Sequence, residues 1–418
     1  MWQSFLNAWK LPDLRKKLLF TALIIAIYRL GCYIPVPGVD TNAVSNAFSA
    51  NAGGVFDFYN LFTGGGLQRV AIFALGIMPY ITASIIMQLL TMVIPKLEAL
   101  MKEGESGQKK VNQYTRYFTV ILALIESVGF VFLFDKQYNA FSGVGGLTPL
   151  RFFLVVLTLT VGTALIMWLG ELITQRGIGN GISLMIFASI VSRLPSGLQM
   201  LFNLNPGYWV LMGIVSVLVV AFVIYVTEGQ RRIPVQYAKR VVGRKVYGGQ
   251  STYLPLRINM AGVIPVIFAS SVLLFPVTIG GMIGGWAKKA ADAIGPSTWW
   301  YIIVEVLLII AFTYFYTAVQ FNPIDQADNL KKYGGFIPGI RPGRPTAAYL
   351  DRVLTRITLP GSLFLAAIVL LPTALIKGIG VPFYFGGTSL LIVVGVALDT
   401  MKQMESQLLM RHYEGFLK

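Results

Sequence analysis

Long apolar runs, separated by short polar or glycine-containing segments, dominate the pattern along this chain. A helix needs about 20 mostly apolar residues to cross a bilayer. Ten runs meet or approach this length, the fifth and tenth being short: Leu18–Ile34, Val70–Ile94, Tyr117–Phe134, Phe152–Leu172, Ile182–Val191, Trp209–Val226, Met260–Ile279, Tyr301–Val319, Leu354–Ile376 and Ser389–Met401. The pattern therefore predicts an all-α, polytopic membrane protein with ten transmembrane helices.

The composition supports this class and excludes several kinds of chemistry. The chain is 55% hydrophobic and 12% charged, whereas soluble proteins carry roughly 25% charged residues. Cys32 is the only cysteine and His412 the only histidine, which excludes a disulfide framework, histidine-based triads and most transition-metal sites. No GxxxxGK[ST] motif is present, so ATP hydrolysis would have to come from another protein. We expect no cofactor, and a membrane enzyme is disfavoured.

The basic residues predict the orientation in the membrane. The net charge is +16, and 26 of the 34 Lys and Arg lie on one side of the bilayer if the N-terminus is cytoplasmic. Loops rich in Lys and Arg stay in the cytoplasm. The distribution therefore places both termini there, and much of the basic excess is explained by topology.

Two apolar segments read almost alike at a distance of 186 positions, Gly76–Ser84 and Gly262–Ser270. Five predicted spans separate the start of one from the start of the other, and an odd number reverses the direction through the membrane. Inverted repeats with interrupted spans are typical of proteins that move a substrate across a bilayer. We therefore predict two inverted five-helix halves, residues 1–202 and 203–418.

A short aromatic segment, Val55–Phe62, lies between the first two spans within a glycine-bounded stretch of about 53–66. It is too short to span a bilayer, and the glycines can act as hinges. One hypothesis is a movable helix folded back into a cavity, because irregular backbone at membrane depth must be buried in protein or line water. The alternative is an external loop on the membrane surface.

Isoleucines recur one helical turn apart, as Ile81 and Ile85 in span two and as Ile182 and Ile186 in span five. Ile267 is the repeat equivalent of Ile81. If the halves face each other, these residues can form a hydrophobic constriction that blocks water and ions. Ordinary helix packing is the alternative for each isoleucine taken alone.

Two large basic loops lie on the predicted cytoplasmic side, at about 228–257 and 322–352. In the first, apolar residues alternate and Gly243 marks a turn, which predicts a β-hairpin. The basic residues of its tip are Lys239, Arg240, Arg244 and Lys245. The second loop presents Arg341 among turn residues. Such arginines suit docking onto an acidic protein or a phosphate backbone; the alternative is that they only fix topology.

Charged residues inside the spans are few, and the candidates among them are Glu126, Glu305 and, near an outer end, Arg29. Such groups are candidates for function, although they can equally be partnered structural ions. No paired carboxylate relay occurs at mid-depth, and this argues against the alternative of an ion-coupled secondary transporter.

Several motifs along the whole chain resemble the SecY family, the pore subunits of the bacterial protein-conducting channel. The matching segments are Ala74–Ile81, Lys102–Gly107, Gln113–Tyr117, Gly177–Ser183, Gln250–Leu256, Pro338–Gly343 and Gly386–Ile392. The resemblance implies a central hourglass pore that translocates unfolded polypeptides and releases transmembrane segments sideways through a lateral gate. It implies no enzymatic activity.

The resemblance also implies roles for individual residues. The pore ring would be Ile81, Ile85, Ile182, Ile186, Ile267 and Ile392. The plug that closes it would include Phe56, Phe58, Tyr59, Leu61 and Phe62. The two basic loops, with Arg341 and Tyr413, would dock the SecA ATPase or the ribosome. Further partners would be SecE, SecG, signal sequences, nascent polypeptides and the lipid bilayer, in the plasma (inner) membrane.

Overall fold

The computed structural model describes residues 9, 11–50, 55–136, 138–196, 199, 206–237, 240–242, 245–247, 251–283, 298–379 and 387–415. The chain divides into two compact units. The first comprises Met1–Leu201, Ser271–Tyr301 and Val396–Lys418, and the second Phe202–Ser270 and Ile302–Gly395. The second unit begins at the junction of the predicted halves, but two later segments belong to the first unit. The two-half division stays a prediction.

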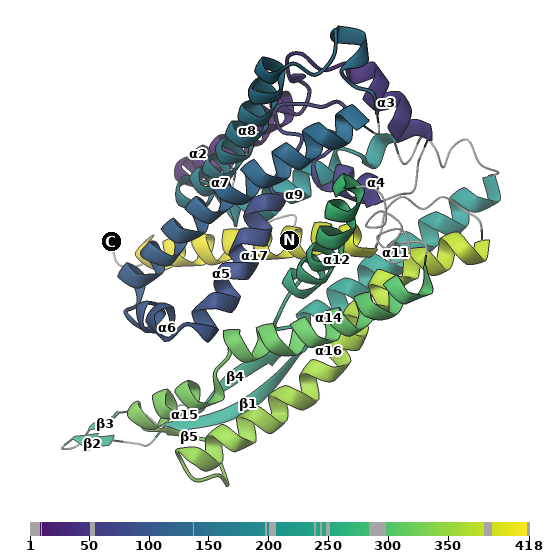
Figure 1. Ribbon diagram of the computed structural model, residues 1–418. Coiled ribbons are helices and arrows are strands. Elements are labelled where there is room, and N and C mark those ends of the chain that lie inside the picture. The colour runs from purple at the N-terminus through teal and green to yellow at the C-terminus, as the bar shows by residue number, and fades with distance from the viewer. Residues whose placement is uncertain are drawn as a thin grey trace. The chain divides into compact units, whose positions relative to one another are not determined.

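Helices make up most of the described chain (Figure 1). The first unit contains, in whole or in part, α2 Pro12–Gly31, α3 Thr41–Ala50, α4 Val55–Phe62, α5 Met78–Val93, α6 Pro95–Lys102, α7 Glu105–Lys136, α8 Pro149–Arg176, α9 Gly181–Val191, α12 Ile264–Ile283 and α17 Gly387–Gly415. The second unit contains α11 Pro206–Glu228, most of α14 Trp299–Gln320, α15 Pro323–Lys332 and α16 Arg344–Ile379.

A helix covers most of each of the ten predicted apolar runs. Among the described residues, five helices are long and apolar enough to cross a membrane by themselves, or six if the bent pair α5–α6 counts as one span. Other helices do not meet these limits of length and hydropathy. Some are too short, as α9 is, and some carry basic residues, as α2 does. The prediction of a helical, polytopic membrane protein is confirmed, whereas the number of crossings stays a prediction.

The second and seventh predicted runs begin too early. Helix α5 starts at Met78 rather than Val70, and α12 at Ile264 rather than Met260. The backbone before each helix is left-handed, with φ of 57° at Gly76 and 64° at Gly262. A continuous right-handed helix is incompatible with these angles. A hydropathy profile does not detect these turns, because the turn residues are as apolar as the helices.

A bend of 98° separates α5 from α6. Pro95 occupies the first turn of α6, and Ile94 before it is extended, with φ of −97° and ψ of 111°. A residue that precedes proline is pushed out of the helical region by the proline ring. The chain therefore turns sharply here, and α6 ends before Glu105, where α7 begins.

The first unit is built around α7 and α8, which pack side by side, with α5 against α7 and α9 against α8 (Figure 1). Polar contacts join its more distant segments. The Tyr28 and Ser189 hydroxyls lie 2.6 Å apart, and Thr21 Oγ1 accepts a hydrogen bond from Ile178 N. A small apolar cluster of Leu14, Ile178 and Met404 anchors the end of α17 to the same unit.

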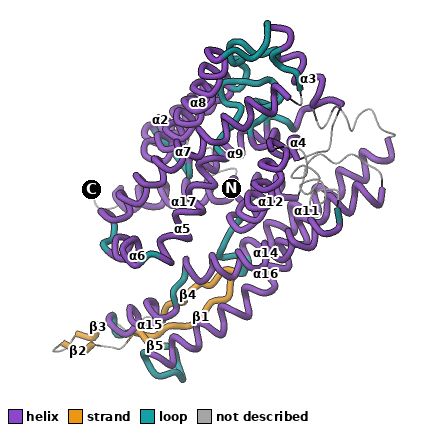
Figure 2. Tube along the Cα trace, in the orientation of Figure 1, coloured by secondary structure: helices purple, strands orange, loops and turns teal. Residues whose placement is uncertain are grey.

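A small antiparallel sheet belongs to the second unit (Figure 2). Strand β1, Gln230–Tyr237, lies in the middle, between β4, Ser251–Arg257, and the short β5, Gly335–Phe336. A second hairpin pairs β2, Arg240–Val242, with β3, Lys245–Tyr247. The pairing of Val242 with Lys245 leaves two connecting residues, one of them Gly243. The predicted β-hairpin is confirmed, and it lies within a mostly helical fold.

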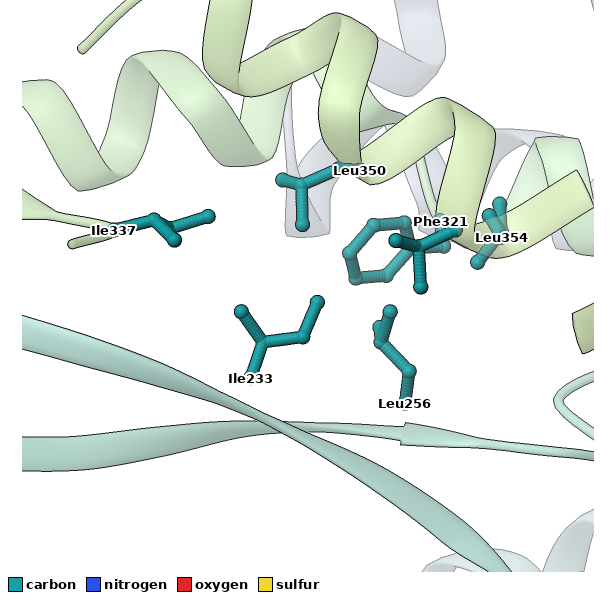
Figure 3. Packing of buried hydrophobic residues seen from close by; sticks show 7 residues of the cluster. Ile233, Leu256, Phe321, Ile337, Leu350 and Leu354 are labelled. Atoms are coloured by element: carbon teal, nitrogen blue, oxygen red, sulfur yellow. The ribbon is translucent and has the colours of Figure 1, made fainter. Parts of the chain in front are cut away.

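The sheet packs on the helices through one apolar core (Figure 3). Its members come from β1, β4, the positions just after α14 and just after β5, and α16: Ile233, Leu256, Phe321, Ile337, Leu350, Val353 and Leu354. Ile233 and Val235 point inward from β1, and the residues beside them are exposed. This two-residue period is expected for a sheet with one buried face.

Leu350→Ala should destabilise the protein, because Leu350 is fully buried between the sheet and α16. Truncation of a buried leucine costs about 2–5 kcal/mol. Thermal unfolding of the detergent-solubilised protein measures the effect. Leu359→Ala, on the same helix but 52% exposed, is the matched control and should have little effect. Equal losses in both variants would contradict the core.

Candidate functional site

The two repeat segments have the same local structure. In each, a left-handed glycine precedes the helix by two residues, Gly76 before α5 and Gly262 before α12. The first turns are also bonded alike. The amides of Tyr80 and Ile81 both donate to the carbonyl just before α5, that of Ile77, and the amides of Val266 and Ile267 both donate to the carbonyl just before α12, that of Val263. The sequence match therefore reflects a repeated structural unit, which positions Ile81 and Ile267 at equivalent points.

All six predicted ring isoleucines lie on described helices. Ile81 and Ile85 lie on α5 and Ile182 and Ile186 on α9, in the first unit, whereas Ile267 on α12 and Ile392 on α17 belong to the second unit. Ile85, Ile186 and Ile392 are almost completely buried, and Ile182 and Ile267 are half-buried. The six residues are thus divided between the two units, and the ring stays a prediction.

Asn180 fixes the start of α9 and so the position of Ile182. Its side-chain oxygen accepts hydrogen bonds from the amides of Ile182 and Ser183, at 3.1 and 3.3 Å. Such a cap satisfies amides that the helix leaves without partners. Ile182 Cγ1 lies 3.2 Å from the position of a β-carbon on Gly170. A larger residue at Gly170 in α8 would therefore displace Ile182.

The short aromatic segment forms α4 and is packed into the first unit against α9. The side chains of Tyr59, Leu61 and Phe62 are buried. Those of Phe56 and Phe58 lie outside the described residues. This geometry matches the hypothesis of a helix folded into the protein better than that of a loop on the membrane surface. The plug role itself stays a prediction.

Tyr59 is the polar anchor of α4. Its hydroxyl lies 3.0 Å from the Leu75 carbonyl oxygen and 3.4 Å from Glu126 Oε2 on α7. Burial raises the pKa of the Tyr59 phenol, and the neighbouring Glu126 carboxylate raises it further, so the phenol keeps its hydrogen. Since it has only one, it donates to one of these oxygens at a time. The ring also packs on Phe130, with centroids 5.4 Å apart.

A tight turn follows α4. Gly64 and Gly65 have φ of 62° and 89°, which glycine adopts without steric cost. Their amides donate to Leu61 O and Asn60 O. The Asn60 side chain also binds Gln68, because its Oδ1 accepts a hydrogen bond from Gln68 N at 3.1 Å. These bonds fix the exit of α4, whereas the preceding glycines, Gly53 and Gly54, lie outside the described residues.

The predicted intramembrane charges have different surroundings. Glu126 contacts the Tyr59 hydroxyl, and Arg29 Nη1 donates to Gly64 O at 3.2 Å. Glu305 is buried on α14, without a hydrogen bond or ion pair to the described residues. Two of these groups therefore contact α4 or the turn after it, which their sequence positions did not indicate.

An ion pair in the first unit escaped the sequence analysis. Arg116 Nε on α7 lies 2.6 Å from Glu171 Oε1 on α8, and the Glu171 side chain is only 19% exposed. The Glu171 carboxylate lies at the end of the apolar run Phe152–Leu172. A carboxylate inside an apolar run was the feature of the sequence that could have indicated a charged partner. Removing one partner of a poorly exposed pair leaves an uncompensated charge, so we assign the pair a structural role.

The two basic loops share the three-stranded sheet, because β5 comes from the second loop and pairs with β1 of the first. Arg341 is exposed in the second loop between Gly339 and Gly343, whose φ values are 81° and 99°. Of the predicted tip residues, Lys239 and Arg244 lie outside the described residues, as do the side chains of Arg240, Lys245 and Tyr413. Their docking roles stay predictions.

Comparisons with known proteins agree with one another. The sequence model of the SecY family matches residues 71–401. The protein translocase subunit SecY of Streptomyces scabiei is 53% identical over the full length of both chains. That of Pseudomonas aeruginosa is 48% identical over 99% of this chain and 96% of its own.

Solved structures share the fold at lower identity. A protein-conducting channel structure aligns with a TM-score of 0.65 at 21% identity, over 93% of this chain and 91% of that one. Sec61 in a canine ribosome–channel complex gives 0.62 at 20% identity with the same coverage. Full-length identity of about half with bacterial relatives establishes the family: the chain belongs to the SecY family of protein translocase subunits.

Proposed function

We propose that this chain is a passive protein-conducting channel of the plasma membrane and not an enzyme. Unfolded secretory polypeptides cross through a pore between the two halves, and apolar segments leave sideways between spans two and three and spans seven and eight. The observation that supports this most is the full-length match, at 53% identity, to a protein translocase subunit. Both termini lie in the cytoplasm in this proposal.

The channel works with partners that supply energy and direction. We place SecE and SecG beside the chain as further subunits, and the SecA ATPase or the ribosome on the cytoplasmic loops. Support for the ribosome comes from Sec61, a fold relative seen in a ribosome–channel complex. Signal sequences and nascent chains are the substrates, and apolar segments partition into lipid at about 0.8 kcal/mol per buried CH₂.

An isoleucine ring suits a pore for chemically diverse polypeptides. Apolar side chains offer no specific hydrogen bonds, so the waist can close around any sequence without selecting one. The same property excludes water and ions when the waist is narrow. A buried helix after span one, α4, then completes the closure as a plug.

Ile81→Asn and Ile267→Asn should each loosen this seal, because an amide side chain favours water in a narrow apolar waist. We expect a higher resting ion conductance in reconstituted bilayers and export of precursors with defective signal sequences. Ile81→Val retains an apolar branched side chain and should keep the seal. Wild-type conductance and signal stringency in both asparagine variants would contradict a waist at these residues.

Tyr59→Phe should weaken plug closure, because it removes the hydroxyl that contacts Leu75 O and Glu126 and keeps the ring. A buried hydrogen bond contributes about 0.5–1.5 kcal/mol, so we expect the open population to rise roughly fivefold. Resting conductance in planar bilayers measures it.

Tyr80→Phe is the matched control for this variant. Tyr80 lies on α5 of the same unit, and its hydroxyl has no hydrogen bond to the described residues. Glu126→Gln keeps an acceptor oxygen beside Tyr59 and should change conductance little. If Tyr59→Phe and Tyr80→Phe leak equally, the hydroxyl does not hold the plug.

Arg341→Glu should slow motor-driven export on the order of tenfold, because hydrogen bonds to charged groups contribute about 1.5–3 kcal/mol. Import of a precursor into vesicles with added SecA measures the rate, and immunoblotting checks the amount of protein. Arg344→Glu introduces the same charge change at an exposed position three residues away and should have a smaller effect. Normal export in the Arg341 variant would reject its role.

A further inference from the structure

Three arginines from separate segments gather around the turn that follows α4. Arg29 comes from the end of α2, Arg69 from the turn itself and Arg193 from the end of α9. Arg29 Nη1 donates to Gly64 O. Arg69 Nη1 and Arg193 Nη2 each lie 3.4 Å from the position that a β-carbon on Gly65 would take. Glycines therefore let three guanidinium groups approach one short stretch of backbone.

Tyr33 orients two of these groups. Its ring centroid lies 4.0 Å from the Arg69 guanidinium carbon and 5.6 Å from that of Arg29. Stacking on an aromatic face holds a guanidinium group without using its hydrogen-bond donors. The Tyr33 side chain and Arg69 are exposed. Because Arg69 is exposed, a ligand that arrives from outside the unit can reach its guanidinium group.

The positive charge of Arg29 and Arg69 is not balanced by a carboxylate within the described part of the chain. The ion pairs found there are Lys102–Glu98, Lys109–Glu105 and Arg116–Glu171. Like charges held close together repel one another unless an anion binds. The cluster is therefore complementary to an oxyanion, which guanidinium groups bind with paired hydrogen bonds.

An exposed apolar stripe runs along α2 to this cluster. Its members on α2 recur three or four positions apart and are all exposed: Leu19, Leu23, Ile27 and Leu30. Residues at this spacing lie on one face of a helix. In a membrane protein this face can accommodate acyl chains, and the arginines lie at its end. A phosphate joined to acyl chains matches both features better than a soluble acidic peptide does.

We propose that Arg29, Arg69 and Tyr33 form a binding site for the phosphate group of an anionic phospholipid, whose acyl chains lie along α2. The predicted orientation places the site in the outer leaflet. Only this choice of leaflet depends on the orientation. The Arg29 bond to Gly64 O connects the site to the turn after α4. None of its three residues belongs to the proposed pore ring or to the two basic loops.

The test measures lipid retention by the full-length protein in a neutral detergent. Native mass spectrometry counts bound phosphatidylglycerol, with phosphatidylcholine of the same acyl chains as the zwitterionic comparison. We expect preferential retention of phosphatidylglycerol and an approximately fivefold loss in Arg69→Gln, since one basic residue near an anionic surface contributes on this order. Lys136→Gln, an exposed basic residue at the end of α7, is the matched control and should retain the lipid.

Competition distinguishes the sources of the anion. Inorganic phosphate at millimolar concentration should displace phosphatidylglycerol only weakly, because it lacks acyl chains. Equal binding of free phosphate and lipid would overturn the lipid assignment, and so would stronger competition by an acidic peptide. Equal retention by the Arg69 and Lys136 variants would overturn the site. None of these readouts depends on transport, so failure here leaves the proposed channel function untouched.

Discussion

Within a bilayer every backbone amide and carbonyl must find a partner in the protein, because lipid offers none. This chain leaves the helical conformation at two apolar places, before α5 and before α12. At the first, the non-helical backbone is hydrogen-bonded within the protein: Val36 N donates to Val70 O, Ile72 N to Ile34 O and Gly76 N to Phe73 O. The non-helical stretch therefore lies within the protein, in contact with the end of α2. Its buried position in turn determines where α4 and Ile81 can lie.

The plug hypothesis requires a contact strong enough to close and weak enough to release. Tyr59 meets this requirement because it donates one hydrogen bond at a time, although two acceptors lie within reach. A single bond contributes about 1 kcal/mol, which a passing polypeptide can exceed by burying a few apolar groups. The second acceptor means that a small shift of α4 exchanges one bond for another. Closure can then tolerate slight movements of the helix.

The sequence predicted the elements whose signal is local. The apolar runs, the basic loops and the hairpin depend on composition and period, and all have counterparts among the described residues. The helix start at Met78 was missed because left-handed φ at Gly76 leaves no mark on hydropathy. The Tyr59–Glu126 contact joins residues 67 positions apart, and no local pattern specifies such a contact. The pairing of β5 with β1 rests on the dipeptide Gly335–Phe336, which is too short to be recognised alone.

The short pairing of β5 with β1 has a mechanical consequence for the two basic loops. Because β5 bonds to β1, both basic loops belong to one sheet, and the sheet is fixed to α16 by the core around Leu350. Groups on rigid elements hold a binding geometry better than groups on free loops. Arg341 lies four residues after Ile337, which is buried in this core. A partner that pushes on the loops would therefore transmit force directly to α16 and would not deform a flexible connection. In the proposed function, a single apolar cluster would in this way couple docking to α16.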